Sequence, residues 1–157
     1  MVKSPFQNSK IKSSLKYQFP SIRFDSLIEN IKLQISRKTR RIKGIFKIID
    51  NENTLLFSFR PNDGRFLPSL QAGTIILKSG YSQNRVIIDD EAIPFVKTGK
   101  SVYCKYIIKT DDNIYPGSEV FIQDTNNNLI AIGTAIQPSF ALMELNSGIG
   151  VKTKHYK

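Results

Sequence analysis

The chain has 157 residues and 40% hydrophobic side chains, which suffices for one ordinary domain or two small ones and excludes general disorder. Its one cysteine excludes an internal disulfide, and no apolar run approaches the roughly 18–20 residues of a membrane-spanning helix. The polar N-terminus lacks the apolar stretch of a signal peptide, so we expect a cytoplasmic protein without a membrane partner.

The formal net charge of +10 is unevenly distributed. Residues 1–80 contain 15 Lys or Arg against 5 Asp or Glu, whereas residues 81–157 contain 8 of each kind. Such an asymmetry favours a polyanionic partner, because each neutralised phosphate releases counterions. The alternative is a basic protein whose charge serves only its solubility.

In chain order, the first 14 residues are rich in Lys, Ser and Asn and are predicted to be a flexible lead-in. Asp25 or Ser26 could cap a short helix. Alternating apolar residues and turn residues predict strands at 33–37, 41–49 and 54–60, with a tight turn at 61–64. Ser69 is expected to cap a helix that ends near Gly80.

The second half predicts several short strands, at 85–88, 101–109, 120–123, 129–136 and 151–156. Asp89 or Asp90 should cap a short helix with Pro94 in its first turn, and Gly99 should end it. A continuous strand at 101–109 would place Tyr103 and Tyr106 on opposite faces, so no aromatic platform for stacking bases is predicted. Short strands separated by Gly and Pro turns indicate a small barrel.

Several segments carry a resemblance to a known family. Residues 89–96, 99–102, 114–120, 129–135 and 148–155 resemble the PUA domain, a small RNA-binding barrel, of archaeosine tRNA-guanine transglycosylase. In this comparison Gly133 permits close backbone packing. Upstream, residues 16–19, 36–42, 62–66 and 71–73 resemble the domain that precedes PUA in that enzyme. The expected fold class is α+β, with a small sheet-and-helix module at 15–80 followed by a PUA-type β-barrel at 81–157.

The resemblance implies a noncatalytic tRNA-binding subunit of a split archaeosine tRNA-guanine transglycosylase, or of a related archaeosine-forming enzyme. Such a subunit would grip tRNA while a separate chain modifies a D-arm guanine. The catalytic barrel of roughly 250 residues cannot fit in 157 residues. One alternative is a stand-alone PUA adaptor in ribosome or other RNA maturation. Another is a structural protein that binds other proteins. A homodimer is left open.

Two basic sets are the candidate RNA-binding residues, and we expect them to form one cationic face that grips duplex RNA. The densest cluster is the predicted hairpin tip, with Arg37, Lys38, Arg40 and Arg41. PUA domains meet RNA through the short helix, the glycine loop and the closing strand, which by resemblance nominates Lys97, Gly99, Lys100, Ser101, Lys105, Lys152 and Lys154. Lys152 and Lys154 alternate onto one strand face. The alternative is a solvated rim in which Gly99 merely caps a helix.

No catalytic residue, metal site or cofactor is predicted. Cys104 and His155 are the one conceivable thiol–imidazole pair, and Cys104 lies on the apolar face of its predicted strand, where a buried inert thiol is expected. The neighbouring acids Asp89, Asp90 and Glu91 are explained by helix capping.

Overall fold

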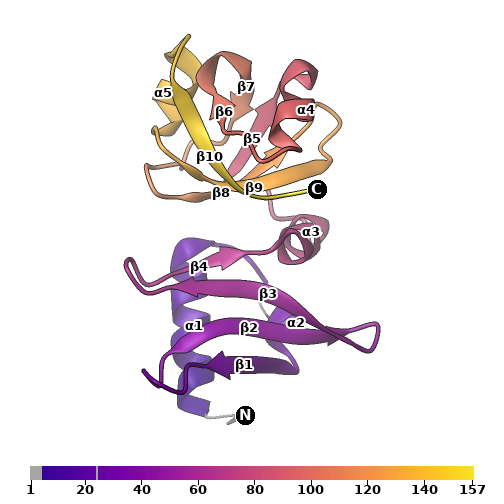
Figure 1. Cartoon of the computed structure of the whole chain (residues 1–157), viewed down its shortest axis with the longest axis vertical. Helices are drawn as coiled ribbons and strands as arrows, with labels where there is room; N and C mark the ends of the chain where they lie inside the picture. The colour runs from indigo at the N-terminus through magenta and orange to yellow at the C-terminus, as the bar shows by residue number, and fades with distance from the viewer. Residues whose placement is uncertain (1–4, 24) are drawn as a thin grey trace. The chain divides into compact units, whose positions relative to one another are not determined.

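The structure, a computed structural model of the chain, describes residues 5–23 and 25–157. Contacts divide the chain into two compact units, Met1–Tyr81 and Ser82–Lys157 (Figure 1). The division falls one residue beyond the boundary expected after residue 80. Among the residues that the structure describes, no helix is long and apolar enough to cross a bilayer.

The first unit opens with helix α1 (Pro5–Gln18). Ile11 and Leu15, one helical turn apart, are buried, and Phe19 directly after the helix is buried with them. Gln18 joins the end of the helix to the sheet, since its Oε1 accepts the Phe66 N–H at 2.8 Å. The flexible lead-in predicted for residues 1–14 is therefore wrong from residue 5 onward, and residues 1–4 lie outside the described residues.

Four antiparallel strands in chain order form the sheet of this unit: β1 (Ile31–Ile35), β2 (Ile42–Ile49), β3 (Glu52–Arg60) and β4 (Arg65–Pro68). Leu33, Ile45 and Phe57 lie in register on neighbouring strands and are buried. Figure 1 shows α1 crossing one face of this sheet. Strand β4 was not predicted.

Two further helices complete the first unit, α2 (Asp25–Ile28) and α3 (Leu70–Lys78). The predicted cap of α3 is confirmed, because the Ser69 hydroxyl accepts the Ala72 N–H at 3.2 Å. Ala72 and Ile76 are buried on one side of α3. Gly80, in the left-handed region with φ +88°, follows the helix end.

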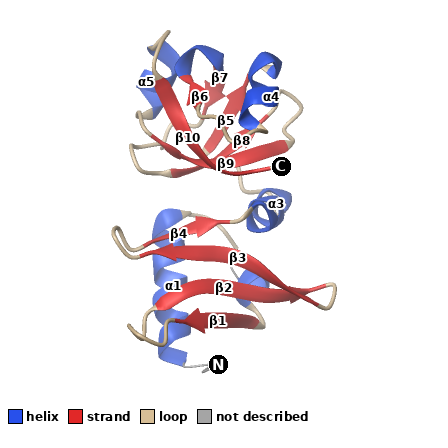
Figure 2. Cartoon of the chain, in the orientation of Figure 1, coloured by secondary structure: helices blue, strands red, loops and turns tan. Residues whose placement is uncertain are grey.

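The second unit is a six-stranded barrel (Figure 2). Its strands are β5 (Arg85–Ile88), β6 (Val102–Tyr103), β7 (Ile107–Thr110), β8 (Glu119–Gln123), β9 (Leu129–Ala135) and β10 (Ile149–Tyr156). The strand order is β6-β10-β9-β8-β5-β7. The two outer strands, β6 and β7, are separated by only three residues of the chain, so the two edges of the sheet lie close together and the barrel is nearly closed. Its core contains apolar side chains that are almost completely buried, among them Val86, Ile88, Val120, Ile122, Ala131 and Val151.

Short helical pieces cap this barrel: η1 (Asp90–Ala92), α4 (Ile93–Val96), η2 (Cys104–Tyr106) and α5 (Ser139–Glu144). The expected cap before α4 is present, since the Asp89 carboxylate accepts the Glu91 N–H at 2.9 Å. Pro94 lies in the first turn of α4, where the backbone N–H it lacks has no helical partner.

The continuous strand predicted at 101–109 is wrong. The η2 turn interrupts it, and the side chain of Ile107 is buried while that of Ile108 is 47% exposed. This corner lets one segment pair with two different strands, because Tyr103 is in register with Ile149 of β10 and Ile107 with Ile88 of β5. Alternation of residue types cannot reveal such a corner.

Candidate nucleic-acid interface

The basic cluster of the first unit lies at the tip of the β1–β2 hairpin, where the sequence predicted it. Arg37, Lys38, Arg40 and Arg41 are all exposed. Ser36 organises the turn: its carbonyl accepts the Arg40 N–H at 2.9 Å, its N–H donates to the Arg41 carbonyl at 2.8 Å, and its hydroxyl accepts the Thr39 N–H at 3.3 Å. Four cations thus project from one short, hydrogen-bonded turn.

Two more arginines flank the neighbouring β3–β4 turn. Arg60 and Arg65 pair across the two strands. Arg60 also forms an ion pair with Asp63, with Nη2 2.8 Å from Oδ2. Since the carboxylate compensates part of this charge locally, the β1–β2 tip is the stronger anion-binding candidate in this unit.

In the second unit, Gly99 lies in the turn that follows helix α4. Its φ is +86°, its N–H donates to the Val96 carbonyl at 2.9 Å, and the next N–H, of Lys100, donates to the Phe95 carbonyl at 3.2 Å. A Cβ placed on Gly99 would lie 2.7 Å from Cε1 of Tyr156. The ring of Tyr156 therefore occupies the side of Gly99 on which a Cβ would lie.

The loop that follows α4 is tied to the closing strand. The Thr153 hydroxyl donates to the Lys100 carbonyl at 2.8 Å. On either side of Thr153, the side chains of Lys152 and Lys154 are exposed, as the alternation predicted, although the register of β10 shifts beside Lys154. The structure thus joins the strand that carries these two lysines to the loop that carries Lys97, Lys100 and Ser101.

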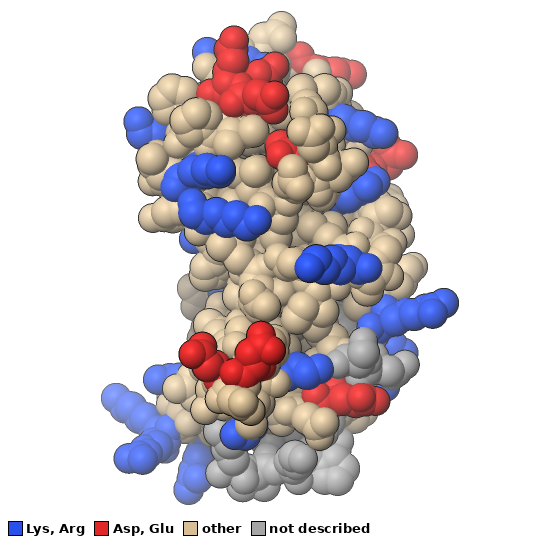
Figure 3. All heavy atoms as spheres, turned by 90° about the vertical axis from the view of Figure 1, so that its right-hand side faces the viewer, with Lys and Arg blue, Asp and Glu red and all other residues tan. Residues whose placement is uncertain are grey.

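Figure 3 shows how charge is distributed over one side of each unit. In the second unit, drawn uppermost, a group of acidic side chains lies at one end and basic side chains lie on both flanks below it.

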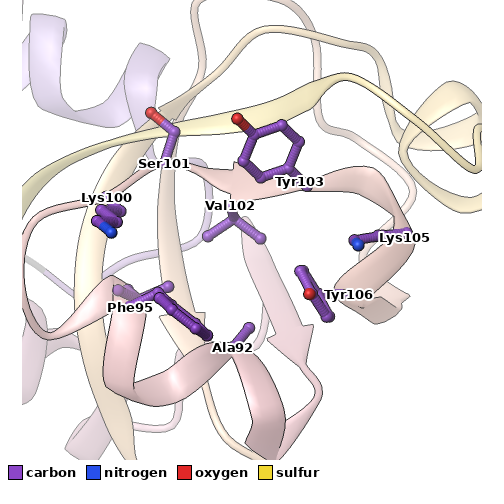
Figure 4. A pocket seen from close by; sticks show the side chains of 9 residues that line it. Ala92, Phe95, Lys100, Ser101, Val102, Tyr103, Lys105 and Tyr106 are labelled. Carbon is purple, nitrogen blue, oxygen red and sulfur yellow. The ribbon is translucent and has the colours of Figure 1, made fainter.

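Beside this loop lies a cavity of about 340 Å³ (Figure 4). Its lining consists of Ala92, Phe95, Val96, Lys100, Ser101, Val102, Tyr103, Lys105 and Tyr106. The side chains of Phe95 and Tyr103 are about half exposed. The ammonium group of Lys100 lies 5.5 Å from the centre of the Phe95 ring, and that of Lys105 lies 4.7 Å from the centre of the Tyr106 ring.

The cavity corrects the prediction that Tyr103 and Tyr106 lie on opposite faces of one strand. Tyr103 and Tyr106 line one cavity rather than opposite faces of a strand, because η2 turns the chain between them. Phe95 of α4 is half-exposed and forms another aromatic wall of the cavity. Aromatic walls with two ammonium groups suit a planar ring that carries a phosphate.

The Cys104 N–H donates to the Gly148 carbonyl just before β10, whereas His155 lies near the other end of that strand. Cys104 is buried, as expected, and burial raises the pKa of its thiol, so it stays protonated and unreactive near neutral pH. Burial and the charge of Lys154 lower the pKa of His155. Within residues 5–23 and 25–157, no three His, Cys, Asp or Glu side chains converge as a metal site would require.

Both units match known families. Residues 84–157 match the PUA domain, and residues 9–81 match the patch-forming domain C2 of tRNA-guanine transglycosylase. The chain is therefore a PUA-domain protein. Over most of its length it resembles tRNA-guanine(15) transglycosylases.

Relatives in sequence are tRNA-guanine(15) transglycosylases. The chain is 31% identical over 147 residues to that of Methanocaldococcus jannaschii, which covers 92% of this chain and 22% of the relative. It is 35% identical over 130 residues to that of Methanosphaera stadtmanae, covering 82% of this chain and 19% of the relative. The chain thus spans about a fifth of the length of these relatives.

Solved structures share the fold of the whole chain. A hypothetical protein from Pyrococcus horikoshii superposes with a TM-score of 0.73 at 20% identity, covering 98% of this chain and 92% of that one. A conserved PUA domain protein from Thermoplasma acidophilum gives a TM-score of 0.69 at 19% identity, covering 95% and 89%. The two-unit arrangement of elements therefore recurs in other chains of similar length.

Proposed function

We propose that this chain is the noncatalytic tRNA-binding subunit of a split archaeosine tRNA-guanine transglycosylase, or of a related archaeosine-forming enzyme. The observation that carries the proposal is the order of its two domains, which matches a fifth of each transglycosylase relative, together with a basic site in each. A catalytic barrel of roughly 250 residues does not fit within these 157 residues. The proposal assigns this barrel to a separate polypeptide.

The two sites suit different parts of an RNA. The hairpin-tip cluster (Arg37, Lys38, Arg40 and Arg41) presents arginines that bind phosphates bidentately, so it reads the backbone rather than the bases. The cavity beside α4 has aromatic walls and two ammonium groups, so it accepts one unpaired nucleotide, with the base against the rings and the phosphate at Lys100 or Lys105.

Salt titration of tRNA binding tests the RNA-binding part of the proposal. If the protein neutralises about five phosphates, the logarithm of the affinity falls against the logarithm of the salt concentration with a slope of about −4 to −5. Arg40→Glu and Lys100→Glu should each weaken binding and make the slope shallower. Lys78→Glu and Lys109→Glu, on exposed lysines outside the proposed sites, are the matched controls. A flat salt response would contradict the proposal.

A second experiment tests the split enzyme. The full chain is mixed with a transglycosylase catalytic chain, and exchange of a guanine in the tRNA D arm is followed with labelled base. We expect exchange only when both chains are present, and co-purification of the two from native extract. Exchange that the catalytic chain performs equally well alone would sink the assignment.

One observation favours a stand-alone PUA adaptor as the second candidate. A subunit of a split enzyme should show an apolar patch for docking on its N-terminal module. In the described part of the first unit, the large hydrophobic side chains that are exposed are Tyr17 and Ile48, whereas the second unit exposes Phe140, Met143, Leu145 and others. An adaptor would bind tRNA with the same salt dependence but would support no base exchange with any catalytic chain.

A further inference from the structure

We propose that Thr153 and Tyr156 of strand β10 are positioning residues that hold the α4–β6 loop, residues 97–101, in its RNA-binding conformation. The inference rests on the proposed RNA-binding function and adds to it two uncharged residues. Both act on the loop backbone, and the lysines and the cavity contact the RNA.

Thr153 holds the middle of the loop. Its hydroxyl donates to the carbonyl oxygen of Lys100 at 2.8 Å, a bond between residues 53 positions apart in the chain. The side chain of Thr153 is half-buried, whereas those of its neighbours Lys152 and Lys154 are exposed. One strand therefore sends its lysines to solvent and its threonine to the loop.

Tyr156 contacts the loop at Gly99, the residue before Lys100. Because Gly99 has no side chain, the tyrosine ring lies where a Cβ would be, with Cε1 2.7 Å, Cζ 3.0 Å and Oη 3.3 Å from that position. The positive φ of Gly99 turns the chain out of α4 at the same point. Tyr156 is 49% exposed, so about half of its surface is covered, in part by Gly99.

The two contacts bear directly on the proposed site. Lys100 and Ser101 line the cavity, and the Lys100 ammonium group lies over the Phe95 ring. A loop released from β10 would sample other conformations, and ordering it on binding would reduce affinity. Neither Thr153 nor Tyr156 carries charge, so releasing the loop leaves the number of neutralised phosphates unchanged.

The test compares tRNA binding over a range of salt concentrations. Thr153→Val keeps the shape of the side chain and removes the donor, and Tyr156→Ala removes the ring. We expect each to weaken binding by about three- to tenfold at an unchanged salt slope, the effect of one typical contact. Thr153→Ser and Tyr156→Phe keep the hydroxyl and the ring and should bind like the wild type. Thr125→Val and Tyr115→Ala, both exposed outside the site, are the matched controls.

A double-mutant cycle identifies the loop as the route of the effect. The loss caused by Thr153→Val should shrink in a Lys100→Gln background and stay the same in an Arg40→Gln background, since residues in one network couple and distant ones add. Equal losses in both backgrounds, or a changed salt slope in Thr153→Val itself, would overturn the proposal.

Amide hydrogen exchange separates this inference from the proposed function. Exchange at Gly99 and Lys100 should be faster in Thr153→Val and Tyr156→Ala than in the wild type. If the wild type binds no tRNA but exchange is faster in the two variants, the RNA-binding function is wrong while the contacts of Thr153 and Tyr156 with the loop are supported. Normal binding and unchanged exchange in both variants would defeat the positioning role alone.

Discussion

Gly133 of β9 lies directly against the backbone of Lys152 in β10. A Cβ at position 133 would stand 2.7 Å from the Lys152 carbonyl oxygen and 2.7 Å from Cγ1 of Val151. The resemblance to a known family implied close backbone packing at this glycine, and this expectation is confirmed. The contact lies in the strand pair β9–β10, where Thr134 is in register with Lys152.

Gly133→Ala should therefore destabilise the second unit. The obstacle is backbone, which cannot rotate away as a side chain can, so we expect a loss of about 1–3 kcal/mol in the free energy of unfolding. Urea unfolding followed by circular dichroism measures it. Ser147→Ala, at an exposed loop position, is the control. A Gly133→Ala protein within about 0.5 kcal/mol of the wild type would contradict the close packing.

Asp111→Asn should also destabilise the second unit. The Asp111 carboxylate accepts the Arg85 backbone N–H at 2.8 Å, Nε at 2.9 Å and Nη2 at 3.0 Å, which joins the start of β5 to the end of β7. Hydrogen bonds to a charged group contribute about 1.5–3 kcal/mol, so a loss of about 1–3 kcal/mol is expected in thermal or urea unfolding. The adjacent, exposed Asp112→Asn should change little. Equal effects of the two substitutions would refute the role of the ion pair.

Phe95→Ala should weaken tRNA binding. Stacking of one base on an aromatic side chain is worth about 1–3 kcal/mol by alanine substitution, and the salt slope should stay as in the wild type because no charge is lost. Since Phe95 is half-exposed, the unfolding free energy should change little. Phe140→Ala, a 66% exposed phenylalanine outside the cavity, is the matched control. Fluorescence titration with tRNA measures the affinities of the Phe95→Ala and Phe140→Ala proteins. Equal affinities would contradict stacking of a base in the cavity.

His155 should make stability depend on pH. Burial first, and then the charge of Lys154, lower the pKa of this imidazole from its ordinary value of 6.5. The unfolded chain therefore binds the proton at higher pH than the folded protein does. The stabilisation is complete above pH 6.5 and is lost as pH falls through the lowered pKa. His155 is the only histidine in the sequence, so His155→Gln should remove this part of the pH dependence.

Urea unfolding between about pH 7 and pH 5, above the range of ordinary carboxylates, measures the effect. The wild-type free energy of unfolding should fall towards the acid side more steeply than that of His155→Gln. Parallel curves for the two proteins would show that His155 titrates alike in the folded and unfolded chains.

Local signals predicted local structure well. The Ser69 and Asp89 caps and the Gly99 turn after α4 each depend on hydrogen bonds within a few residues, and all three are present. The β1–β2 hairpin likewise follows from alternation on both sides of a polar turn. Helix α1 was missed because Ile11 and Leu15 stand among Lys, Ser and Asn, so the apolar stripe is too thin to stand out.

By itself, the sequence determined the cationic character of the hairpin tip and the caps of α3 and of the turn before α4, because these depend on composition and on neighbours along the chain. The resemblance to a known family implied the two-module organisation. Only the tertiary structure decided the cavity and the loop contacts. Tyr103 and Tyr106 face one cavity because η2 turns a corner that closes the barrel, and Thr153 reaches Lys100 across 53 residues. Such contacts follow from strand pairing between distant segments, and no local pattern of residues encodes that pairing.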